Sequence, residues 1–238
     1  MPGRDVYADV LALLTPQPRK LLDIIEDHFG RQVQFLETTL PCGARGNATW
    51  GNNQPIVRLS PWDGDLAVIT HELLHLKRRV EGHPWIRNLH EAREREHITT
   101  GLYNLIDEVA FDEEFVRLGF DPLHGLEQVV HCLLNTLEAQ QRQRYQVSED
   151  SDRLLAAAHA WVFLRARNAP SAPAFLRSLD GTQHARAKRW GEALARAVRA
   201  ADFRTPGGTA RLSDECAQGI LGMGRNSYEL KDCPRVPR

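Results

Sequence analysis

Five consecutive residues, His71-Glu72-Leu73-Leu74-His75, form the pattern with the clearest chemical meaning in the sequence. They match HExxH inside a segment with helical periodicity, and side chains four residues apart on a helix lie one above the other. Two imidazoles placed in that way can bind one tetrahedral zinc ion, while the glutamate beside them can take a proton from water. In a shuffled chain of the same composition, about 0.03 copies of the motif are expected. We therefore interpret the motif as a metal site.

The helix that must carry this motif is predicted at about residues 65 to 80. Its apolar residues form one narrow stripe, made of Leu66, Ile69, Leu73, Leu76 and Val80. At about 100° per residue, the two histidines lie roughly 150° from the centre of that stripe. The histidines are therefore expected outside the main packing face. The alternative is an ordinary helix whose histidines pair with carboxylates.

A catalytic zinc ion takes three protein ligands and keeps one position open, so a third ligand must come from elsewhere in the chain. The longer pattern HExxHxxGxxH is excluded, because Arg78 and Glu81 stand where it needs glycine and histidine. A predicted helix at 101–118 offers Glu108 and Asp112 instead, with the spacing ExxxD. These carboxylates lie among apolar residues, where a charge is costly unless it is paired or bound to metal.

Asp107 and Glu108 are adjacent, and only one of them can face the histidines, because neighbouring side chains on a helix point about 100° apart. Glu108 shares its face with Asp112 and with the flanking apolar residues. Asp107 and Glu114 point away from that face and are predicted to be solvated. The wheel therefore favours Glu108 as the third ligand.

HELLH followed by an ExxxD helix resembles the gluzincin branch of the zinc metallopeptidases. The continuation Leu118-Gly-Phe-Asp-Pro122 is similar to the HtpX-like and prenyl-protein-endopeptidase-like group. The compact gap between His75 and Glu108 is closer to zincin domains of the ImmA/IrrE type, which cleave repressors. The likeness covers about residues 54 to 135, within the span that one catalytic domain needs.

The resemblance implies a zinc-dependent endopeptidase that acts on a protein or peptide substrate. In that reading His71, His75 and Glu108 bind Zn²⁺, and Asp112 accepts a hydrogen bond from His71 that fixes its tautomer. Glu72 is then the general base, which deprotonates the metal-activated water and passes the proton to the leaving amine.

Two further features are expected from the resemblance. The predicted strand at 56–60 precedes the motif, and in zincins such an edge strand pairs with an extended substrate; an ordinary structural strand is the equal alternative. A tyrosine or histidine that stabilises the oxyanion is also expected. Five candidates stay open: Tyr103, His97, His83, His131 and Tyr145.

The periodicity predicts an α+β protein that is predominantly helical, with a zincin-like catalytic domain and a small sheet. Strands are expected at 32–37 and 56–60, separated by a turn-rich stretch at 41–54. Helices are expected at about 5–14, 18–29, 65–80, 85–98, 101–118, 122–146, 149–168, 172–179 and 183–201. Three segments follow: a metallopeptidase core at 1–140, a basic helical extension packed on it at 141–204, and an irregular C-terminal tail at 205–238.

The 238 residues carry a formal net charge of −1, but the charge is divided unevenly along the chain. Residues 1–140 hold 13 basic and 21 acidic side chains, a net charge of −8, whereas residues 141–211 hold 13 and 6, a net charge of +7. The basic region is predicted to be a solvated helical bundle or a surface for an anionic partner. The alternative function is thus a non-catalytic or regulatory zincin-like protein that binds nucleic acid or an acidic protein partner. A hydrolase of non-peptide amides is a third possibility with the same zinc chemistry.

The first residues place Asp5 and Asp9 where a signal peptide needs a basic start and an apolar run. No stretch approaches the roughly 18 apolar residues of a membrane-spanning helix. A cytoplasmic protein without a membrane segment is therefore predicted.

Overall fold

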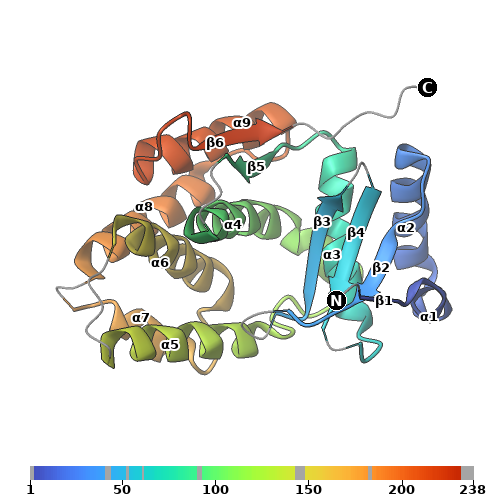
Figure 1. Cartoon of the computed structure of the whole chain (residues 1–238), viewed down its shortest axis with the longest axis horizontal. Coiled ribbons are helices and arrows are strands. Elements are labelled where there is room, and N and C mark those ends of the chain that lie inside the picture. The colour runs from blue at the N-terminus through green and yellow to red at the C-terminus, as the bar shows by residue number, and fades with distance from the viewer. Residues whose placement is uncertain are drawn as a thin grey trace. The chain divides into compact units, whose positions relative to one another are not determined.

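The computed structural model describes residues 3–40, 44–51, 54–60, 62–89, 93–142, 148–181 and 184–231. The protein is α+β and mostly helical, which confirms the coarse fold class, while the zincin-like identity of the domain stays a prediction (Figure 1). The chain forms two compact units. The first holds the described residues up to Gly82 and Phe111–Gly125, and the second holds His83–Ala110 and the described residues from Leu126 onward.

The first unit contains a small mixed sheet with the strand order β1-β2-β4-β3 (Figure 1). β2 runs parallel to β4, while β3 pairs antiparallel with β4. Alternate residues of β4 are buried, namely Pro55, Val57 and Leu59, so one face of the sheet packs on the core. The strands are β1 (Arg4–Asp5), β2 (Gln34–Glu37), β3 (Gly46–Gly51) and β4 (Gln54–Leu59).

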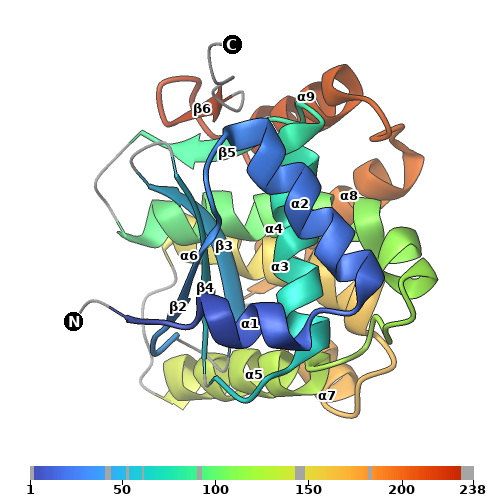
Figure 2. The same ribbon diagram turned by 90° about the vertical axis from the view of Figure 1, so that its right-hand side faces the viewer.

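Helices α2 and α3 lie side by side in the first unit and share one core with the sheet (Figure 2). α2 begins with prolines in its first turn and ends at Gly30, whose φ of 60° is the left-handed conformation typical of a helix end. Leu22, Phe35 and Leu73 are fully buried in this core. The helices are α1 (Tyr7–Leu13), α2 (Pro16–Phe29), α3 (Leu66–Val80) and the last part of α4 (Arg93–Arg117).

The second unit is built from helices and a two-stranded sheet. α6 packs closely on α8, where a Cβ atom at Gly191 would come within 2.6 Å of the His159 ring. A π-helical turn, Val162–Ala166, continues α6, and another, Glu215–Ile220, continues α9. The remaining elements are β5 (Trp85–Asn88), α5 (Leu126–Arg142), α6 (Glu149–Trp161), α7 (Ala172–Ser178), α8 (Ala185–Ala200), α9 (Pro206–Asp214) and β6 (Tyr228–Lys231).

The sheet differs from the prediction in two respects. The stretch predicted as turns contains β3, because its polar residues pair with the apolar strand β4, as Thr49 does with Ile56. Pairing with a neighbouring strand overrides the local turn preference of such residues. The predicted edge strand, β4, is an inner strand between β2 and β3.

The helix predicted at 85–98 is wrong at its start. Residues 85–88 form β5, which pairs antiparallel with β6, and α4 then runs without interruption from Arg93 to Arg117. The tail from residue 205 was predicted as irregular with one short helix near 214–221. A π-helical turn does lie there, at Glu215–Ile220, but the rest is not irregular, because Thr205 caps α9 and β6 follows. β5 and β6 pair although more than half of the chain separates them in the sequence, and no local sequence pattern predicts such a pairing.

Neither compact unit coincides with the predicted segments 1–140, 141–204 and 205–238, which stay predictions about domains. The boundaries between the units fall at Gly82, Ala110 and Gly125. Within the described ranges, no helix combines the length and the apolar character needed to cross a membrane.

Candidate metal centre

The HExxH motif lies in the middle of α3, as predicted. Asp65 caps the helix, and its carboxylate accepts hydrogen bonds from the backbone N–H groups of Ala67 at 2.9 Å and Val68 at 3.3 Å. Ile69 and Leu73 are fully buried on the face toward the sheet and α2. The apolar stripe therefore fixes which side of the helix the histidines occupy.

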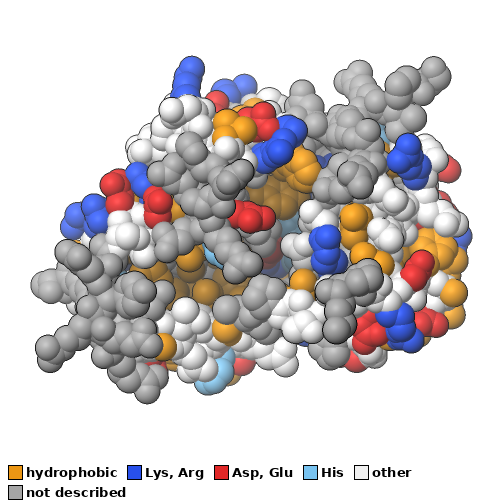
Figure 3. All heavy atoms as spheres, viewed as in Figure 1, with side chains coloured by type: hydrophobic (Ala, Val, Ile, Leu, Met, Phe, Trp, Pro, Cys, Tyr) orange, Lys and Arg blue, Asp and Glu red, His pale blue; other side chains and the backbone are white. Residues whose placement is uncertain are grey.

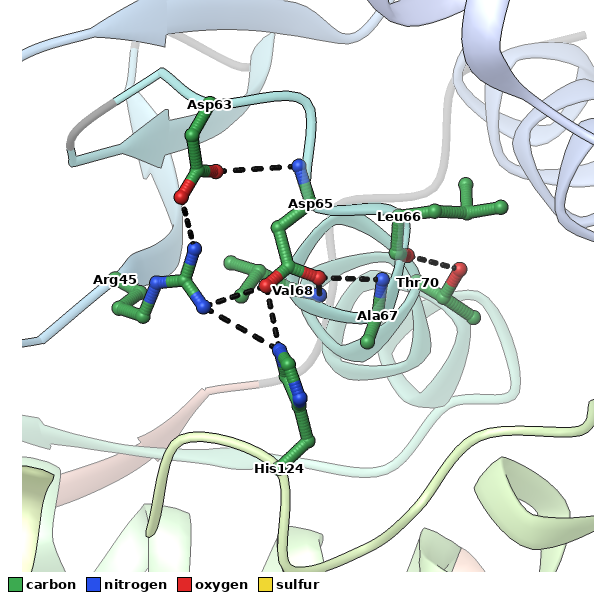
Figure 4. A network of polar contacts seen from close by, with 8 residues as sticks. All are labelled: Arg45, Asp63, Asp65, Leu66, Ala67, Val68, Thr70 and His124. Carbon is green, nitrogen blue, oxygen red and sulfur yellow. Dashed lines mark hydrogen bonds and ion pairs between the residues drawn. The ribbon is translucent and has the colours of Figure 1, made fainter. Parts of the chain in front are cut away.

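A polar network holds the N-terminus of α3 (Figure 4). Asp65 accepts from Arg45 and from His124, and Arg45 also pairs with Asp63. Burial raises the pKa of Asp65, but the hydrogen bonds from His124 and Val68 outweigh it, so that the pKa is lowered overall. The network connects the helix that carries HExxH to the loop before β3 and to the turn after α4.

The motif's histidines contact aromatic residues at the end of α4, which belong to the same core as the apolar stripe of α3. Phe111 packs edge-on against His71 and His75, with ring centroids 5.1 and 4.9 Å away, and Phe115 packs against His71 at 5.8 Å. His75 is buried and His71 is half-buried. α4 thus covers the side of α3 that faces away from the main stripe.

Asp112 lies next to this histidine pair. Burial raises the pKa of its carboxyl to about 7, although the nearby charge of His71 acts in the opposite direction. A carboxyl that is both buried and close to an imidazole is well suited to hold the imidazole proton. The specific hydrogen bond between His71 and Asp112 stays a prediction.

Glu108 lies one turn before Asp112 on the same uninterrupted helix. One ligand atom each of His71, His75 and Glu108 lies within 4.8 Å of the other two. Ligands of a tetrahedral zinc ion lie about 3.4 Å apart, given bond lengths of about 2.1 Å, and a spacing of at most 4.8 Å is of the same order. Two imidazoles and one carboxylate are also the donor types that zinc prefers. The group can therefore hold a metal ion.

Glu108 is contacted by two residues that the sequence analysis did not predict. Its Oε2 atom accepts a hydrogen bond from Trp161 Nε1 at 2.8 Å and pairs with Arg165 Nη1. The side chains of Arg165 and Glu108 are only 2% and 7% exposed. Burial lowers the pKa of Arg165 to about 9, so the guanidinium stays charged at neutral pH. The single available signal was a tryptophan and an arginine four residues apart, and it gave no indication of their partner.

Glu72 is buried against the first residue of β3. A Cβ atom at Gly46 would lie 2.5 Å from Glu72 Oε1, closer than any real contact, so a side chain here would force the Glu72 side chain to move. Gly46 was predicted as one of several turn residues, and its contact with Glu72 was not foreseen.

The prediction that Asp107 is solvated is wrong, because this residue is 1% exposed. α4 is enclosed around this position, where Ile98, Leu102 and Leu105 are fully buried, so its helical wheel does not bring Asp107 to solvent. Glu114 is partly exposed and pairs with Lys77 Nζ at 2.9 Å.

The candidates for an oxyanion-stabilising residue are not narrowed by the structure. His83 is buried, and its Nδ1 pairs with Thr209 Oγ1 at 2.8 Å. His97 and His131 are exposed, Tyr103 is half-buried, and Tyr145 lies outside the described residues.

No family model, curated protein or solved structure matches this chain. What the site can do therefore follows from its donor set. Two histidines and a glutamate can bind a metal ion, and a buried glutamate in the same motif can exchange a proton with a nearby water molecule.

Proposed function

We propose that the protein is a zinc-dependent endopeptidase of the gluzincin type, in which His71, His75 and Glu108 hold the metal. The observation that carries the proposal is the convergence of these three ligand atoms within 4.8 Å, with Glu72 in the same motif. A non-catalytic metal site would need the three ligands but has no use for Glu72, which binds no metal in this scheme.

The roles of the residues follow from their chemistry. A bound zinc ion would polarise the substrate carbonyl and make water more acidic. Glu72 takes a proton from the attacking water while the water oxygen bonds to the carbonyl carbon of the substrate. Glu72 then gives that proton to the nitrogen as the C–N bond breaks, so that an acid and an amine leave. Asp112 keeps His71 in the tautomer that presents a free nitrogen.

The supporting observation for a peptide substrate is β3. In the order of the described strands, β3 is the edge strand, with β4 as its neighbour. It begins at Gly46, beside Glu72. An extended peptide can add to such an edge through main-chain hydrogen bonds, which would bring its carbonyl groups to the glutamate. A small non-peptide amide would not need a strand in this position.

The alternative, a basic helical region that binds nucleic acid or an acidic protein, has weaker support. Arg186 pairs with Asp152, Lys188 pairs with Asp180, and Arg165 is buried on Glu108. On the face that Figure 3 shows, the described blue and red side chains are interspersed. This distribution is typical of a solvated surface rather than of a continuous site for polyanions.

The proposal is tested by incubating the zinc-loaded protein with a proteome-derived peptide library and identifying new termini by mass spectrometry. Glu72→Gln is the matched control, because it keeps the shape of the side chain and loses the basicity. We expect cleavage by the wild type and none by Glu72→Gln. Equal cleavage by both proteins would remove Glu72 from the mechanism, and no cleavage by either would leave a metal-binding protein without this activity.

A further inference from the structure

The second unit contains a buried cluster of three side chains around Glu108. Trp161 Nε1 and Arg165 Nη1 both donate to the same oxygen, Oε2, of the carboxylate. The Arg165 guanidinium carbon also lies 5.8 Å from the centre of the Trp161 ring, within the range of a cation–π contact. Both residues come from one stretch of chain, the end of α6 and the π-helical turn that follows it.

This cluster needs an explanation beyond stability. Removing an arginine and a glutamate from water is costly, and a well-packed apolar pair in their place is often as stable or more so. π-helical turns are rare and are frequently found at functional sites. A costly ion pair, built on such a turn and directed at a candidate metal ligand, therefore suggests a role at the metal centre.

We propose that Arg165 and Trp161 are positioning residues of the metal centre, an inference that rests on the proposed function. Their two bonds hold Glu108 by Oε2 and fix the plane of the carboxylate. The positive charge of Arg165 beside Oε2 also repels a second cation at that oxygen. Metal is thereby directed to the other oxygen, Oε1.

Donors that orient a metal-ligating carboxylate change metal affinity by about 10 to 100-fold when they are removed. Trp161→Phe keeps the ring and removes only the N–H donor. Arg165→Lys keeps the charge and loses the planar guanidinium, whereas Arg165→Met loses both. Metal affinity should fall from wild type to Arg165→Lys and further to Arg165→Met, with Trp161→Phe also below wild type.

The experiment titrates Co²⁺ into the metal-free full-length protein and follows the visible absorption of the bound ion, which reports ligand geometry. Arg167→Met is the control, because Arg167 is an exposed neighbour on the same stretch. We expect about 10-fold or greater losses of affinity and a shifted spectrum for Trp161→Phe and Arg165→Met, and no change for Arg167→Met. Melting temperatures identify variants that fail to fold. If Arg165→Met fails to fold, the metal affinities of Trp161→Phe and Arg165→Lys decide the question.

A second comparison separates a positioning role from a general effect on folding. In a Glu108→Ala background, Trp161→Phe should not change the residual metal affinity further, because the acceptor side chain that Trp161 orients is gone. If the wild type binds Co²⁺ and Trp161→Phe binds it with the same affinity and spectrum, the positioning role is wrong while the proposed function stands. If the wild type binds no Co²⁺ or Zn²⁺, the proposed function itself fails.

Discussion

The carboxylate of Glu72 lies so close to Gly46 that a Cβ atom at Gly46 would be 2.5 Å from Glu72 Oε1. The first residue of β3 therefore sets the position of the proposed general base. Gly46 and Glu72 belong to the same compact unit, so this relationship depends on the sheet and α3 alone.

Gly46→Ala should displace the Glu72 carboxylate and lower kcat by about 100-fold, the cost of a misplacement of about 1 Å at a catalytic group. Metal content should be unchanged, because Glu72 is not one of the three ligands. Steady-state kinetics and metal analysis of the same preparation check both statements. Gly181→Ala is the control, because nothing lies within 4 Å of a Cβ atom there. Full activity in Gly46→Ala would show that the position of Glu72 does not matter.

Substitutions of Asp107, Glu108 and Asp112, three of the acidic residues of α4, should have different effects. Glu108→Ala should lose metal and activity together, since it removes a ligand. Asp112→Ala should lose about 10 to 100-fold in metal affinity, as residues that orient a ligand do. Asp107→Ala should lower the melting temperature, because Asp107 is buried, and should leave metal affinity near the wild-type value. Metal retained in Glu108→Ala and lost in Asp107→Ala would reverse the assignment.

The network at the start of α3 should make stability depend on pH in acid. The pKa of Asp65 is lower in the folded protein than its usual value of about 3.9, so the folded state binds fewer protons than the unfolded state. The stabilisation is complete above that value and is lost as the pH falls through the folded pKa. Asp65→Asn should flatten this acid-side loss in urea titrations. The control Asp27→Asn, at an exposed position of α2, should leave the slope as it is.

If an extended substrate pairs with β3, its cleavage should depend on the backbone N–H groups of the substrate. Methylating the amide nitrogen of a cleaved peptide at alternate positions should lower kcat/KM, while methylation at the intervening positions should have little effect. This period of two is the signature of strand pairing. Equal effects at all positions, or none, would exclude pairing with β3.

The parts of the fold that follow from local periodicity were predictable. The apolar stripe of α3 placed its bounds within a residue or two, because burial of Ile69 and Leu73 gives a strong period of 3.6. The pairing of β5 with β6 was not predictable, since Trp85 and Lys231 lie far apart in the sequence. Buried Asp107 was missed because a helical wheel assumes that one side of the helix reaches water.

The residues of the candidate site were also predictable only in part. Helical spacing predicted that His71 and His75 converge, while Glu108 was added from the need for a third ligand, the helical wheel and the resemblance; the three ligand atoms lie within 4.8 Å of one another. Their role as metal ligands stays a prediction. Trp161 and Arg165 could not be found, because they reach Glu108 from more than fifty positions away in the sequence and only tertiary packing brings them there.

Metal stoichiometry tests the central claim most directly. The wild type, His71→Ala, His75→Ala and Glu108→Ala would be expressed with zinc, dialysed against metal-free buffer and analysed by inductively coupled plasma mass spectrometry. We predict about one zinc ion per chain in the wild type and a small fraction of that in each variant, because three ligands are the minimum that a catalytic zinc site uses. A wild type without zinc, or three variants that keep it, would contradict the assignment of these residues as a metal centre.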